Sequence, residues 1–162
     1  MSDSQSFMQR AIALSKEALA KPGCNPFGAV IVRDGDIVGE GLNHAGAHFD
    51  PTSHGEIEAI RDACARLQCL ELKDCDLYTS CEPCALCVAA MQIVGIRKLY
   101  YAASLKQSGV ALAASLRPTI DVDLLRAEAG AGVHERRMPA EQIGDVDALR
   151  VLEAWAARQQ PD

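Results

Sequence analysis

The sequence lacks the features that mark exported and membrane proteins. None of its 162 residues belong to an apolar run long enough to span a bilayer. The N-terminal stretch MSDSQSFMQRAIALSKEAL alternates polar and apolar side chains, without the uninterrupted apolar centre of a signal peptide. We therefore expect a cytoplasmic protein.

The chain also lacks an excess of basic charge. It has 16 Lys and Arg against 22 Asp and Glu, a net charge of -6. Affinity for phosphate-rich partners comes largely from Lys and Arg, so nucleic acid is not the expected partner. There is no internal repeat, low-complexity tract or linker. The length fits a single domain, 1–162, ending in a helical tail from about 140.

Hydrophobic spacing and turn residues predict an α/β domain in which helices cover both faces of a mixed sheet. A hairpin is expected around Asp34-Gly35, because apolar runs flank this turn signal. A loop is expected over 46–53. Buried strands are expected over 75–80 and 96–103, and a further strand over 133–138. Helices are expected over 4–20, 55–68, 83–94, within 104–118, over 123–129 and over 145–158.

Three of the seven cysteines lie in one short stretch, CEPCALC. In a reducing compartment such cysteines are more often metal ligands, catalytic groups or core residues than disulfides. Cys84 and Cys87 are three residues apart, so both thiols face one side of the predicted first turn, which Pro83 opens as the first helical residue. This spacing is half of a zinc site. Alone, it equally fits a redox pair, a core pair or a structural zinc knot. Cys81 is expected to be buried beside the site.

A second stretch, SHGEIEAIRDAC, supplies a third metal ligand, His54, and a carboxylate, Glu56. Ser53 and Glu56 also fit a helix capping box, which involves no chemistry. His-x-Glu followed by Pro-Cys-x-x-Cys, however, is the signature of zinc nucleobase deaminases. Three ligands leave the fourth position of one zinc ion open for water, and the nearby carboxylate predicts a proton shuttle. The candidates for closing that position are Cys81, Cys75 and His44.

On these residues the chain resembles the cytidine deaminase superfamily, and most closely its guanine deaminase and tRNA adenosine deaminase branch. The matching segments are PFGAVIVRDG, GLNHAG, DPTSHGEIEAIR and LYTSCEPCALC. The resemblance implies a three-layer α/β/α sandwich around a five-stranded sheet, and usually a homodimer. It implies that zinc binds His54, Cys84 and Cys87 and that Glu56 shuttles protons. Asn43 would hydrogen-bond the base and Phe27 would line the pocket, and the other expected substrate contacts are Gly55, Ser80, Cys81 and Glu141.

Two departures from the family pattern bear on the substrate. The family usually has Ala where this chain has Gly55, and guanine deaminases tend to carry an acidic residue after the fourth strand, where SLKQSGVALAASLRP has none. The candidates to replace it are three tail carboxylates, Glu128, Glu135 and Glu141. The predicted substrate is a small free base with a 2-amino-4-oxopyrimidine edge, guanine or isocytosine. The alternatives are a tRNA adenosine deaminase, a cytosine or aminotriazine deaminase and, from another class, an inactive zinc-stabilised interaction domain.

Overall fold

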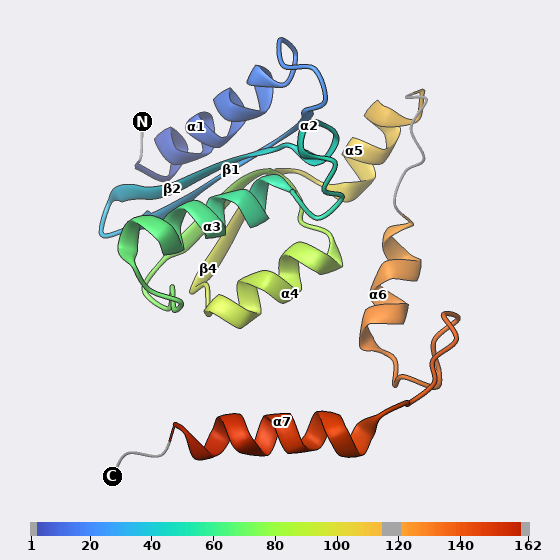
Figure 1. The fold of residues 1–162 in the computed structure, drawn as a ribbon. Coiled ribbons are helices and arrows are strands. Elements are labelled where there is room, and N and C mark those ends of the chain that lie inside the picture. The colour runs from blue at the N-terminus through green and yellow to red at the C-terminus, as the bar shows by residue number, and fades with distance from the viewer. Residues whose placement is uncertain (1–2, 115–120, 160–162) are drawn as a thin grey trace. The chain divides into compact units, whose positions relative to one another are not determined.

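The computed structural model describes residues 3–114 and 121–159. The chain divides into two compact units, the first ending at Leu125 and the second beginning at Arg126. The helices and strands are shown in Figure 1 and are α1 (Asp3–Glu17), β1 (Asn25–Arg33), β2 (Asp36–Asn43), α2 (Ala45–His48), α3 (Gly55–Leu67), β3 (Asp76–Cys81), α4 (Ala85–Val94), β4 (Lys98–Ala103), α5 (Leu105–Leu112), α6 (Val122–Gly130) and α7 (Asp145–Ala157).

The strands of the first unit form one mixed sheet in the order β2-β1-β3-β4. β1 is antiparallel to β2 and to β3, and β3 is parallel to β4. The predicted hairpin is confirmed, since Asp34 and Gly35 both have positive φ in the turn between β1 and β2. Four strands occur among the described residues rather than five, and 133–138 is irregular instead of the expected strand.

Helices cover both faces of this sheet, which confirms the α/β/α layering (Figure 1). On one face α1 packs Leu14 against Val30 and Tyr78. On the other face α3 and α4 bury Ile60 and Met91 in a second cluster. The clusters divide the strand residues between them, because alternate side chains of a strand point to opposite faces.

Glycines let the helices lie close to the sheet. A Cβ on Gly28 would lie 2.5 Å from the carbonyl oxygen of Ala11 in α1. A Cβ on Gly41 would overlap the carbonyl oxygen of Gly55, at the start of α3. Because Gly41 has no side chain, the first turn of α3 can lie directly against β2.

Several predicted boundaries differ from the structure. α1 ends at Glu17 rather than at residue 20, and the expected loop over 46–53 begins with the single helical turn α2. The prediction that 96–103 is a buried strand is wrong, because β4 is the last strand in the sheet order and Tyr101 is 50% exposed. No helix in the described ranges is long and apolar enough to cross a bilayer.

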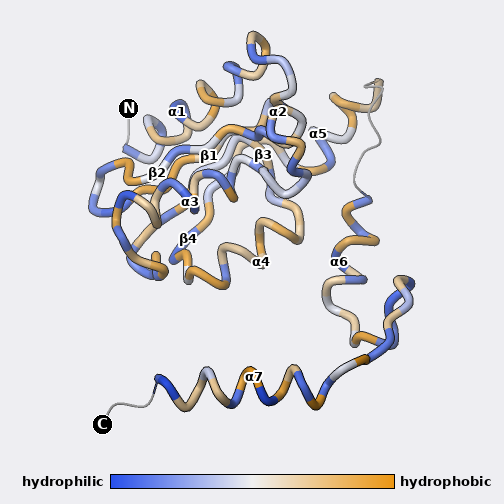
Figure 2. The backbone as a smooth tube through the Cα atoms, viewed as in Figure 1, coloured by the Kyte–Doolittle hydropathy of each residue, from blue (hydrophilic) through white to orange (hydrophobic). Residues whose placement is uncertain are grey.

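The second unit contains the end of α6 and the whole of α7. Along α7 the apolar side chains recur at helical spacing, which Figure 2 shows as alternating bands of hydropathy. Leu149, Leu152 and Trp155 are all more than half exposed. The tail predicted as a helix over 145–158 is thus helical over nearly that range.

Candidate metal centre and active site

Two helix N-termini of the first unit carry the predicted zinc ligands. His54 is the N-cap of α3 and Cys84 is the N-cap of α4, and both have extended backbone dihedral angles. Cys87 lies in the first turn of α4 and is fully buried. The assignment of Pro83 as the first helical residue is wrong, because α4 begins at Ala85 and the proline precedes the cap. The cap position turns the Cys84 thiol toward Cys87.

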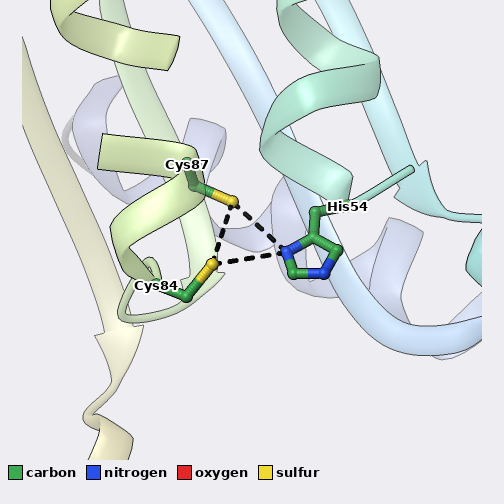
Figure 3. A group of neighbouring side chains, drawn as sticks. All are labelled: His54, Cys84 and Cys87. Atoms are coloured by element: carbon green, nitrogen blue, oxygen red, sulfur yellow. Dashed lines mark hydrogen bonds between the residues drawn. The ribbon is translucent and has the colours of Figure 1, made fainter. Parts of the chain in front are cut away.

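The three donor atoms have the spacing of a tetrahedral zinc site. The Nδ1 atom of His54 lies 3.5 Å from the Cys84 sulfur and 3.4 Å from the Cys87 sulfur, and the two sulfurs are 3.7 Å apart (Figure 3). Zinc–sulfur bonds of about 2.3 Å and zinc–nitrogen bonds of about 2.0–2.1 Å at tetrahedral angles place the sulfurs about 3.8 Å apart and each sulfur about 3.6 Å from the nitrogen. The residues present therefore fit a zinc ion.

Hydrogen bonds among the three ligand side chains shift their pKa values. The hydrogen bond between the Cys84 and Cys87 sulfurs lowers the pKa of Cys84 to about 4. The same bond, together with burial, raises the pKa of Cys87. The hydrogen bond to the Cys84 sulfur raises the pKa of His54. One thiolate is thus present before the metal binds, and binding has to displace the proton of Cys87.

No fourth protein ligand joins the cluster in the parts of the chain that the structure describes. His54, Cys84 and Cys87 are the one group of three or more potential ligands found there whose donor atoms lie within 4.8 Å of one another. Cys81, Cys75 and His44 do not close the site. Burial raises the pKa of the Cys81 thiol, which keeps it protonated beside the centre. An open fourth position is typical of catalytic zinc sites rather than structural ones.

Glu56 extends from the first turn of α3 toward the cysteines and is 5% exposed. Its Oε2 atom lies 3.4 Å from the Cys87 sulfur, and its Oε1 atom accepts a 2.9 Å hydrogen bond from Thr79. Burial raises the pKa of Glu56, and the Thr79 hydrogen bond opposes that effect. The raised pKa makes this carboxylate a stronger proton acceptor than an exposed one.

The capping-box interpretation of Ser53 and Glu56 is wrong. The N-cap of α3 is His54, without a side-chain cap hydrogen bond, and the Ser53 hydroxyl donates instead to Glu58 at 2.8 Å. Glu56 therefore takes no part in a helix cap, and its carboxylate lies beside the metal centre. The sequence analysis missed Thr79, for which the available signal was a hydroxyl in the middle of a strand predicted to be buried.

Asn43, the predicted base contact, is 3% exposed at the end of β2. Its Oδ1 atom accepts two hydrogen bonds of 3.1 Å, one from the side chain of Asn25 and one from the backbone N–H of Ala45. These donors fix the orientation of the amide. His44, the next residue, bonds through its backbone N–H to the Ser53 carbonyl, so Asn43 lies beside the segment that carries His54.

Phe27, Gly55 and Ser80 meet where β1 passes the start of α3. A Cβ on Gly55 would lie 2.6 Å from the carbonyl oxygen of Phe27, so the glycine allows the two backbones to touch. The backbone N–H of Gly28 donates to the Ser80 hydroxyl at 3.0 Å. An open pocket of about 490 Å³ adjoins them and is lined by Ile12, Ser15, Pro26, Phe27, Ser80, Cys81, Ala102, Ala103, Gln107, Ser108, Ala111 and Leu112.

The three tail carboxylates belong to the second unit. Glu128 accepts a hydrogen bond from the backbone of Arg137, and Glu135 accepts one from the backbone of Gly132. Both therefore stabilise the fold of that unit. Glu141 is exposed in the segment before α7, and its contact with substrate stays a prediction.

Hydrolytic removal of an amino group from a heterocycle requires a Lewis acid with an open position and an adjacent proton carrier, and zinc-dependent deaminases are the class built in this way. The model of the cytidine and deoxycytidylate deaminase zinc-binding region matches residues 1–103. The chain belongs to this family and is a zinc-dependent hydrolytic deaminase.

Individual relatives were found in two branches of the family. Guanine deaminase of Bacillus subtilis is 36% identical over 151 residues, which cover 93% of this chain and 92% of that protein. A crystal structure of guanine deaminase from Bacillus subtilis matches with a TM-score of 0.83 at 35% identity, covering 98% of this chain and 96% of that one. The tRNA-specific adenosine deaminase of Aquifex aeolicus is 38% identical over 103 residues, 64% of this chain and 68% of that protein.

Proposed function

We propose that this enzyme deaminates a small free base with a 2-amino-4-oxopyrimidine edge, with guanine and isocytosine as the two candidate substrates. Water replaces the amino group, the ring carbon gains a carbonyl oxygen, and ammonia leaves. The observation that carries the proposal is the buried carboxylate of Glu56 beside three donor atoms spaced for zinc. The likeness to a guanine deaminase over nearly the whole chain supports the substrate class.

The proposed roles follow from the positions of the side chains. His54, Cys84 and Cys87 would hold zinc, which when bound supplies a Lewis acid that activates the attacking water. Glu56 takes one proton from that water and delivers it to the ring nitrogen, and it later carries the second proton of the same water to the departing amine. The walls around Glu56 exclude bulk water, because both it and Thr79 are almost completely buried.

The orientation of Asn43 supports a substrate with a carbonyl group. Both hydrogen-bond acceptor directions of its Oδ1 atom are occupied by Asn25 and Ala45, so Asn43 meets a ligand as a donor. A donor pairs with a carbonyl oxygen or an unprotonated ring nitrogen and disfavours an amino group at the same place. Guanine and isocytosine both present such an oxygen, on a carbon that one ring N–H separates from the carbon bearing their amino group.

An ammonia-release screen with a catalytic variant tests the proposal. The panel is guanine, isocytosine, cytosine, adenine, their nucleosides and aminotriazines. Glu56→Gln keeps the shape of the side chain but cannot accept the proton, so zinc content is expected to stay at one per chain while kcat falls by about 10³-fold or more. Turnover of the variant at the wild-type rate contradicts the assigned role. Release of ammonia from none of the bases contradicts the substrate class.

The second candidate is a tRNA adenosine deaminase, because chains of that function match more than half of this sequence. Binding to tRNA is expected to rely on Lys and Arg and to weaken steeply with salt. The net charge of -6 opposes such binding. Titration with tRNA at low salt discriminates the two: submicromolar binding together with inosine formation would favour this candidate over the free base.

We also propose that the protein is a cytoplasmic homodimer in which the whole chain works as one deaminase domain with its tail. The support for a dimer is the outer face of α4, a helix without a charged residue, on which Ile93 is 84% and Val88 is 42% exposed. Apolar side chains gathered on a helix favour a covered interface. Light scattering over a range of concentrations tests this, and the mass of one chain at all of them contradicts it.

A further inference from the structure

The hydroxyl of Thr79 is placed to control how Glu56 works. Thr79 lies in β3, where it pairs with Ala29 of β1 on one side and with Tyr101 of β4 on the other. It is 0% exposed, and its hydroxyl donates to Glu56 Oε1 at 2.9 Å. This contact joins residues 23 positions apart, the central strand and the first turn of α3.

Several features of Thr79 restrict the direction in which its hydroxyl can donate. A buried hydroxyl without a partner is costly, so Thr79 gains by keeping this acceptor. A β-branched side chain in a strand has few accessible χ1 rotamers, which fixes the direction in which the hydroxyl points. The strand is itself held on both edges. Thr79 is therefore a rigid donor rather than one that follows the carboxylate.

The two oxygens of Glu56 consequently have different surroundings. Oε1 faces Thr79, while Oε2 faces the metal centre at 3.4 Å from the Cys87 sulfur. Rotation of the carboxylate about its last torsion would break the hydrogen bond to Thr79, and only a half-turn, which exchanges the two equivalent oxygens, would restore it. We propose that Thr79 is a positioning residue that holds one oxygen of Glu56, so that the other oxygen, which faces the metal centre, accepts and delivers the proton in each turnover.

This inference rests on the proposed function of Glu56 and adds a mechanical requirement to it. A residue that positions a catalytic group affects kcat more than KM, since it changes the reacting geometry rather than substrate contacts. A residue that only satisfies a core hydroxyl affects stability and leaves kcat per folded, zinc-loaded molecule unchanged. The two roles therefore separate in kinetics normalised to zinc content.

Thr79→Val is the principal test, because valine has nearly the shape of threonine and no hydroxyl. The measurements are zinc per chain, the thermal midpoint, and kcat and KM for the most rapidly deaminated base of the ammonia screen. We expect zinc to stay near one per chain, KM to change less than about threefold and kcat to fall about 10- to 100-fold, the usual effect of removing a hydrogen bond that supports an active-site group. A kcat within twofold of the wild-type value would overturn the proposal.

A second pair of variants separates donor strength from packing and remains decisive if Thr79→Val does not fold. Thr79→Ser keeps the hydroxyl, and Thr79→Cys has a similar size but a weaker donor. We expect serine to restore kcat to within about fivefold of the wild type and cysteine to stay at least fivefold below serine at equal zinc content. Equal kcat values for serine and cysteine contradict the proposal.

The Glu56→Gln variant, measured in parallel, separates the proposed role of Glu56 from the proposed role of Thr79. If Glu56→Gln keeps turnover, the proposed function of Glu56 fails and the role of Thr79 fails with it. If Glu56→Gln is inactive while Thr79→Val is fully active, only the positioning role is lost and the assignment of the proton shuttle stands.

Discussion

The proposed role of Asn43 as a hydrogen-bond donor to the base depends on Asn25 and Ala45, which occupy its acceptor oxygen, and a substitution can replace this donor by an acceptor. In Asn43→Asp one carboxylate oxygen can keep the hydrogen bonds from Asn25 and Ala45, while the other oxygen replaces the Nδ2 donor. An acceptor facing a substrate carbonyl leaves both groups unpaired, so kcat/KM for the oxo base is expected to fall roughly 100-fold. The ratio of activity on the amino analogue, 2,6-diaminopurine or 2,4-diaminopyrimidine, to that on the oxo base should rise.

Asn25 supplies the matched control for that experiment. Asn25→Ala removes one of the two donors that hold the Asn43 amide but leaves the Ala45 backbone in place. The expected loss in kcat/KM is about three- to tenfold without a change in the preferred base, in keeping with about 1 kcal/mol for one hydrogen bond. If Asn43→Asp and Asn25→Ala show the same selectivity for oxo over amino bases as the wild type, Asn43 does not read that position of the substrate.

The contact between β2 and α3 depends on Gly41. In Gly41→Ala the new Cβ overlaps the Gly55 carbonyl, and both are backbone atoms of packed elements that cannot move aside cheaply. We expect a loss of about 2–3 kcal/mol in the free energy of unfolding, measured by urea titration, and weaker zinc retention because His54 is the N-cap of α3. Gly109→Ala, where a Cβ meets no atom within 4 Å, should be neutral or slightly stabilising. Equal stability of the two variants contradicts this account.

The ion pair between α1 and β2 makes a pH-dependent contribution to the free energy of unfolding. Arg10 donates from Nε and Nη2 to the two oxygens of Glu40 at 2.7 and 2.6 Å. The hydrogen bond from Arg10 lowers the pKa of Glu40 below its usual value. A carboxyl whose pKa is lowered in the folded state stabilises the fold at pH values above its unfolded pKa, which is near 4.3. This contribution is lost as the pH falls through the pKa of the folded state.

Glu40→Gln is therefore expected to lower the free energy of unfolding at pH 7 and to have a smaller effect at pH 3, below the unfolded pKa. The loss at pH 7 should be about 0.5 kcal/mol, because the pair is partly exposed and solvent screens it. Urea titrations of chelator-treated protein at both pH values measure this without interference from the metal. Glu71→Gln is the control, since its ion pair with Lys73 is about 70% exposed and should contribute nothing measurable. A loss at pH 3 as large as at pH 7 would rule out the ion pair as the cause.

Zinc is expected to stabilise the entire first unit, since its ligands come from the N-termini of two helices on the same face of the sheet. A ligand that binds only the folded state adds about 4 kcal/mol at a thousandfold excess over its Kd. Chelation should therefore lower the thermal midpoint, and less so at pH 5.5, where competition from protons at Cys87, whose pKa is raised, already weakens binding. Scanning calorimetry measures both effects. His54→Ala should have one midpoint with or without chelator, and a chelator-induced shift in this variant would place the metal elsewhere.

The sequence predicted those parts of the layered architecture that depend on residues close together in the chain. The hairpin turn at Asp34-Gly35 and the spacing of apolar residues in α3 are properties of neighbouring residues, and both predictions are confirmed. The buried character expected of β4 was wrong because its apolar composition does not reveal that it is the last strand in the sheet. The sheet order is decided by contacts between distant segments, which hydrophobic periodicity does not encode.

The sequence by itself determined the metal centre and the kind of chemistry, because the two cysteines are a helical turn apart and the His-x-Glu pair opens another helix. Such spacings fix side chains within one element. Only the tertiary structure decided that Thr79 holds Glu56, that Asn25 orients Asn43, and that Gly55 lies against Phe27. These contacts join residues 18 to 28 positions apart, and their partners are chosen by how strands and helices pack rather than by any local pattern.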